Sequence, residues 1–188
     1  RYLTTVAIDA GTNDGPTGVT EHGKYKGYLW RILGYYDMDT KLGYLMPWGG
    51  YVFVSGDAAA GDGKDKSFVR ICRDCFYSMA YLGYELISDS DPEAVDNVII
   101  PFIGLKFTPN ILDKKLGLEG TFTILDTDKA ISGLNGKGSE LDLRANYNIN
   151  DNNALRLIFA RFWKKDYFKY LFGTDTIDQI VMEYELKF

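Results

Sequence analysis

Long hydrophobic runs are missing from this chain of 188 residues, and so is any basic stripe. No apolar stretch approaches the roughly 20 residues that a membrane-spanning helix needs, so the chain could enter a bilayer only as strands. The net charge of −5 argues against nucleic acid as a partner, because phosphate contacts need clustered Lys and Arg. The opening "RYLTTVAIDAG" lacks the pattern of a secretory signal, so we expect either a mature sequence or a piece of a longer one.

Cysteine and histidine are too scarce for a metal or haem site. Cys72 and Cys75 form "CRDC", and Phe76 stands where covalent haem attachment would need a histidine. With no second cysteine pair and only His22 elsewhere, zinc is disfavoured, and the plain interpretation in an oxidising exterior is a local disulfide. Redox exchange is the alternative. We expect no cofactor and no metal.

Catalytic constellations are also lacking. His22 lies in a Gly-rich loop, and forcing it together with Asp14 and Glu21 into a rim protease or lipase has little support. The aspartates of "SGDAAAGDGKD" and "SDSDPEAVD" do not match the calcium-loop pattern, and they are explained more simply as solubilising charge. We therefore expect no enzyme.

Aromatic residues, in contrast, are plentiful, at 15% of the chain. That content suits aromatic belts at two membrane interfaces. Trp30, Trp48 and Trp163 could instead stack on sugars, but interface anchoring explains them more simply.

Two segments alternate clearly between apolar and polar residues. In 139–150, "SELDLRANYNIN", the odd positions from Leu141 are apolar or small and the even ones are polar or charged; 116–124 repeats the pattern more weakly. A period of two predicts β-strands with two different faces. The first segment covers about ten residues, which is the length of a tilted membrane-crossing strand.

Eight such strands can be counted. We predict them at 2–10, 26–37, 41–56, 97–108, 115–125, 139–149, 154–164 and 178–188. Tight connections at 37–41, 109–115 and 149–153 alternate with long polar ones at 11–24, 57–96, 126–138 and 165–177. This alternation is typical of an antiparallel up-and-down transmembrane β-barrel. We expect a single β-barrel domain over 1–188, with the longest extracellular loop at 57–96.

Three positions disturb the pattern. Pro47 would remove a ladder hydrogen bond unless it lies at a bulge, and Pro101 lies in a segment with the same two-sided apolar character. Alternation in 154–164 holds until Arg161, where we expect either a bulge or the membrane boundary.

The last residues give the most specific pattern: Met182, Tyr184, Leu186 and Phe188 are large and apolar, with Glu183, Glu185 and Lys187 between them. The chain thereby resembles bacterial outer-membrane β-barrel proteins, whose C-terminal strand carries such a signature for the assembly machinery. More narrowly, "GYLW" at 27–30, "KLGY" at 41–44 and "GYVFVSGD" at 50–57 are similar to the C-terminal part of alginate-export-type and related putative porins. That similarity implies a larger barrel of which this chain is the C-terminal portion.

The resemblance implies an outer-membrane protein in contact with lipid and with the barrel-assembly machinery. We expect a porin-like channel for passive passage of small hydrophilic solutes, with loop 57–96 narrowing its mouth. The alternative is a closed structural or surface-binding barrel whose extracellular loops recognise a partner; a homo-oligomer or a neighbouring membrane protein also stays open. Alternation predicts these pore-lining residues: Arg31, Glu119, Asp142, Arg144, Arg156, Glu183 and Glu185.

Their mixed signs differ from the Arg- and Lys-rich pores that carry anionic polymers. Inward charges could also form a salt-bridge network that fills a narrow lumen. A soluble barrel of the lipocalin type is a third option, but its interior is apolar, whereas the strands here look inverted.

Overall fold

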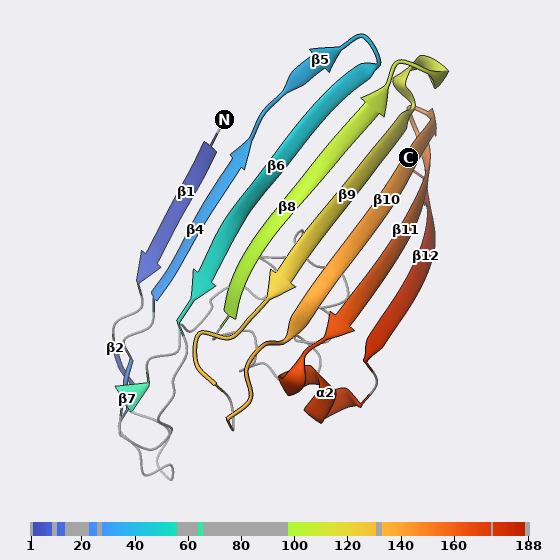
Figure 1. The fold of residues 1–188 in the computed structure, drawn as a ribbon. Helices are drawn as coiled ribbons and strands as arrows, with labels where there is room; N and C mark the ends of the chain where they lie inside the picture. Colours follow the sequence, from blue (N-terminus) through green and yellow to red (C-terminus); the bar gives the residue numbers. More distant parts are fainter. Residues whose placement is uncertain are drawn as a thin grey trace.

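The structure, a computed structural model, describes residues 2–8, 11–13, 23–25, 28–55, 64–65, 98–130, 133–173 and 175–186. Its main sheet contains eight antiparallel strands that pair in chain order, which confirms the predicted up-and-down arrangement (Figure 1). Across the sheet these strands are β1 (Tyr2–Ile8), β4 (Tyr28–Tyr35), β6 (Gly43–Val54), β8 (Val98–Pro109), β9 (Leu116–Leu125), β10 (Gly138–Asn150), β11 (Asn153–Lys164) and β12 (Thr176–Leu186).

Shorter strands and helices accompany this sheet. Strand β5 (Met38–Thr40) extends the hairpin with β6, and a second sheet joins β2 (Gly11–Asn13), β3 (Gly23–Tyr25) and β7 (Lys64–Asp65). Helix is confined, within the described ranges, to α2 (Asp166–Phe172) and the 3-10 turn η2 (Leu112–Lys114). Among those ranges, no helix is long and apolar enough to cross a membrane.

The described sheet is open, so the antiparallel up-and-down part of the prediction is confirmed and closure into a barrel stays a prediction. β1 and β12 form its two margins, and no ladder joins them in the part of the chain that is described (Figure 1). Because the number of strands is even, β1 begins and β12 ends at the same end of the sheet. The two edge strands, β1 and β12, therefore run in opposite directions.

The two ends of the sheet differ. At the end that we call the turn end, uppermost in Figure 1, short connections follow β4, β8 and β10. At the opposite end, the loop end, lie the longer connections 126–137 and 165–175, the second of which contains α2. The predicted alternation of short and long connections is thus present in the described residues.

Side chains close the first tight turn. The Thr40 hydroxyl accepts hydrogen bonds from the backbone N–H groups of Leu42 and Gly43, each over 3.2 Å. Gly43 has φ of +145°, and a Cβ there would lie 2.2 Å from the Thr108 carbonyl oxygen, so only glycine fits. The turn thus fixes the start of β6 against the end of β8.

Neither proline produces a bulge. The β6–β8 register runs through Pro47↔Leu105 and Tyr51↔Pro101 without a shift. On its other side, the carbonyl oxygen of Pro47 accepts a hydrogen bond from the N–H of Tyr36 over 3.1 Å, just past the end of β4. The missing donor therefore falls where the β4–β6 ladder ends, and costs little.

Arg161 also lies in regular pairing, opposite Leu141 and Asp178, so the bulge considered there is absent. The register shift in this hairpin occurs instead between Asn148 and Asn150, next to the turn.

Candidate pore-lining face

The register divides the side chains of the main sheet between two faces. Val52 pairs with Ile100, Phe102 with Thr123, Thr123 with Glu140, and Glu140 with Phe162, so all of these side chains share one face. This face carries the buried residues of the sheet, and we call it the inner face. The opposite one is the outer face.

All seven residues predicted to line a pore lie on the inner face. The strand registers place them there: Arg31 on β4, Glu119 on β9, Asp142 and Arg144 on β10, Arg156 on β11, Glu183 and Glu185 on β12. Local alternation alone was enough to group them, because a period of two fixes the face of every residue in a regular strand.

The inner face is packed towards the loop end. An apolar cluster there consists of Leu29, Val52, Val54, Val98, Ile100 and Phe102, with Leu33 and Trp48 against it. On the same face, farther across the sheet on β11, Phe162 is fully buried, and its ring centroid lies 5.6 Å from that of Phe168. Helix α2 thus folds back over the end of β11 and covers part of this face.

Polar groups are buried in the same half. Thr121 and Thr123 on β9, Glu140 and Asp142 on β10, and Lys164 at the end of β11 are 0–5% exposed. Charged groups are buried only where polar or charged neighbours compensate the loss of water. The loop-end half of the inner face is therefore a packed region of mixed polarity.

Towards the turn end, the same face is accessible. Arg156 donates to Glu183 over 2.8 Å and to the side-chain oxygen of Asn146 over 2.9 Å, and the Arg156 and Glu183 side chains are 46% and 42% exposed. An ion pair that exposed contributes between zero and about 1 kcal/mol. The network therefore orients charge at the surface more than it stabilises the sheet.

A second charged row crosses the accessible half. Lys106 on β8 pairs in register with Glu119 on β9, and Glu119 pairs with Arg144 on β10. Sequence reasoning missed Lys106 because the segment 97–108 is apolar on both faces. The signal that could have found it was its even position, shared with Phe102 and Gly104 on the face opposite Ile103 and Leu105.

The outer face is apolar and exposed. Ile103 is 66% exposed, Ile180 72% and Met182 73%. The same face carries further exposed residues: Tyr28, Ile32, Leu105, Leu118, Phe122, Ile124, Leu143, Leu155, Leu157, Trp163, Tyr184 and Leu186. The polarity of an ordinary half-buried sheet, apolar inside and polar outside, is thus reversed.

Aromatic rings gather on the outer face near the loop end. On β4 and β6, Trp30 stacks on Tyr51 at 4.9 Å, and Tyr28 stacks on Phe53 at 5.4 Å. Trp163, at the loop end of β11, lies 6.5 Å from Phe122. Such a group resembles part of an aromatic girdle.

One ion pair interrupts the apolar surface. In the strands β4 to β12 of the main sheet, as far as they are described, Arg161 and Asp178 are the charged residues of the outer face. Arg161 donates from Nε to Oδ1 over 2.6 Å and from Nη2 to Oδ2 over 2.8 Å, so the pair is bidentate. Both residues lie within three positions of the loop end of their strands.

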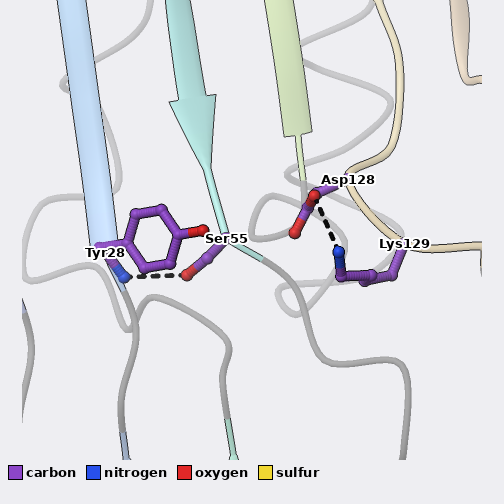
Figure 2. Close-up of polar contacts among 4 residues, drawn as sticks. All are labelled: Tyr28, Ser55, Asp128 and Lys129. Atoms are coloured by element: carbon purple, nitrogen blue, oxygen red, sulfur yellow. Dashed lines mark hydrogen bonds and ion pairs between the residues drawn. The ribbon is translucent and has the colours of Figure 1, made fainter.

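The loop end also has local polar contacts (Figure 2). Ser55, the serine of the quoted "VSGD", accepts a hydrogen bond from the N–H of Tyr28 over 2.8 Å and donates its own N–H to the Tyr28 carbonyl over 3.0 Å. Lys129 contacts Asp128 over 3.2 Å (Figure 2). Ser55 therefore has a structural role, since it continues the β4–β6 pairing past Val54.

Several predicted features lie outside the described residues or are only partly within them. Met182, Tyr184 and Leu186 of the predicted assembly signal project from the outer face of β12, whereas Phe188 is outside. Cys72, Cys75 and His22 are outside as well, and so is most of loop 57–96. Among the described residues, no group of His, Cys, Asp and Glu side chains could hold a metal ion.

Comparisons with protein-family models, with curated proteins and with solved structures found no match. The similarity to outer-membrane barrels and porins therefore stays a prediction.

Proposed function

We propose that this sheet is the wall of a bacterial outer-membrane β-barrel that acts as a porin-like channel for small hydrophilic solutes. The observation that carries this proposal is the reversed polarity of the sheet, apolar and exposed outside, charged inside. A soluble monomer rarely exposes an apolar patch above a few hundred Å². Here the apolar surface runs from β4 to β12.

Hydrocarbon is the occupant that fits the outer face best. Strands β8 to β12 are 10–13 residues long, matching the roughly 9–11 residues of a tilted membrane strand. The aromatic group and the Arg161–Asp178 pair both lie towards the loop end, where a bilayer would give way to headgroups. On this proposal, Arg161 marks the membrane boundary.

Water is the occupant that fits the accessible half of the inner face. Arg156, Glu183, Lys106, Glu119 and Arg144 would be costly against lipid, but they suit a hydrated lumen. A bilayer also requires every backbone group to be paired, so the free edges of β1 and β12 must be paired in the membrane-inserted form.

The alternative function is a closed barrel that acts through its loops. The packed loop-end half of the inner face favours it, because Phe162, Glu140 and Val52 are fully buried there. On this alternative, the lumen would not conduct ions, and the loop end would bind a partner.

The test has two steps. Protein extracted from membranes in detergent is run on a gel with and without heating, and a mobility shift on heating would support a folded barrel. The protein is then inserted into a planar bilayer. Stepwise conductance supports the channel, whereas membrane insertion without conductance favours the closed barrel. A protein that stays in the aqueous fraction would contradict both.

A further inference from the structure

Three charges on the inner face have no partner among the residues that the structure describes. Lys106, Glu119 and Arg144 are neighbours in one transverse row, yet no ion pair or side-chain hydrogen bond joins them to each other or to another described residue. The Nε atom of Arg144 is shielded from water and has no hydrogen-bond partner. The Lys106 side chain is exposed, and Glu119 and Arg144 are partly exposed.

The other inner-face charges of β8 to β12 are engaged. Arg156 pairs with Glu183, and interaction partners are present for Glu140, Asp142, Lys164 and Glu185. Counted together with the row, the inner-face charges of these strands are four cations and five anions, so the row differs from the other charges in being unpaired within the described part of the chain. Two cations and one anion give the row a net charge of +1.

Unpaired charges on a hydrated wall act on the ions that pass it. A fixed charge raises the local concentration of counter-ions, and basic side chains select for anions while acidic ones select for cations. The Arg156–Glu183 pair has no net charge, and it contributes much less to this field.

We propose that Lys106, Glu119 and Arg144 form a charge filter in the accessible half of the wall, with Lys106 and Arg144 attracting small anions and Glu119 attracting small cations. This inference rests on the proposed channel function and goes beyond it, since it assigns the selectivity for small ions to three residues and adds Lys106 to the wall.

The test measures the chloride-to-potassium permeability ratio from the reversal potential in a KCl gradient across a planar bilayer. A unit charge about 10 Å from an ion in water changes its local concentration by about a factor of two. Removing a charge changes the local concentrations of chloride and potassium in opposite directions, so we expect Lys106→Gln and Arg144→Gln each to lower the ratio by up to about fourfold, and the double variant by more. Glu119→Gln should raise it by up to about fourfold.

Lys41→Gln is the matched control. Lys41 is exposed at the tip of the β5–β6 turn, outside the row, so its loss should leave the ratio unchanged. Each variant must keep the heat-dependent mobility shift. Lys106→Met and Arg144→Met remove the same charges and replace any glutamine variant that fails to fold.

The outcomes separate the two proposals. Ratio changes of opposite sign for the lysine and glutamate variants support the filter. Conductance with the same ratio in all row variants overturns the filter and leaves the channel intact. A wild-type protein that inserts but never conducts overturns both.

Discussion

The outer and inner faces of one sheet are built by the same strands but suit opposite solvents. On β11, Leu155 and Leu157 point outwards and are exposed, whereas Arg156 points inwards and pairs with Glu183. The strand itself cannot distinguish a soluble sheet from a membrane wall, because the period of two is the same in both. The distinction comes from which face is buried. Here the face that carries most of the charged residues is also the one that carries the buried residues.

The inner face is itself divided. Its loop-end half is packed around Phe102 and Phe162, and its turn-end half exposes the ion pair of Arg156 and the row of Lys106, Glu119 and Arg144. A channel needs the second half, and a closed barrel is favoured by the first. Substitutions in each region can therefore test whether the regions differ as the structure indicates.

The largest effect is expected in the packed half. Phe162→Ala removes a fully buried ring that contacts Phe168 of α2, and we expect it to lower the free energy of unfolding by about 3–5 kcal/mol. Urea titration of the protein folded in lipid vesicles measures the change. The matched control is Ile180→Ala on the outer face, where 72% of the side chain is exposed. Similar losses for the two variants would mean that Phe162 is not in a packed core.

A charged side chain introduced on the outer face should destabilise the protein. Leu157→Arg places a cation among Phe159, Leu155 and Met182, and in a bilayer we expect a loss of about 2–4 kcal/mol in the free energy of unfolding. Val181→Arg, on the inner face of the neighbouring strand beside Glu183, should cost less than about 1 kcal/mol. Equal costs in lipid vesicles would contradict the assignment of the two faces.

The smallest effect is expected at the exposed ion pair. Arg156→Gln removes the contacts to Glu183 and Asn146, and since the pair is nearly half exposed, the free energy of unfolding should fall by no more than about 1 kcal/mol. The same titration measures it at low and high salt. A loss of several kcal/mol would show that the turn-end half is buried in the folded protein.

Much of the fold could be predicted because the strands are regular. The segment predicted at 139–149 is β10 at 138–150, and the segment predicted at 154–164 is β11 at 153–164. The tight connections predicted at 37–41 and 149–153 follow β4 and β10 in the structure. The shared face of Glu119, Arg144 and Arg156 followed from the same alternation.

The misses have physical causes. Helix α2 lies in a segment that was predicted only as a loop, although apolar residues at 167, 168, 171 and 172 have helical spacing. The sequence left open whether Pro47 lies at a bulge; it does not, and the missing N–H falls at the end of the β4–β6 ladder. Lys106 was overlooked because both faces of its segment are largely apolar. Closure could not be predicted from periodicity, which describes a strand and not the number of its neighbours.

The most direct test of the account asks which solvent each face of β11 meets. Nitroxide labels are placed one at a time through Ala154→Cys, Leu155→Cys, Arg156→Cys and Leu157→Cys, in a Cys72→Ser, Cys75→Ser background, and the protein is reconstituted in lipid vesicles. Accessibility to oxygen, which concentrates in lipid, is compared with accessibility to a water-soluble nickel complex.

We predict that the labels at 155 and 157 favour oxygen and that those at 154 and 156 favour nickel, with a period of two. Nickel accessibility at all four positions, or no alternation between them, would contradict the assignment of one face to lipid and the other to water.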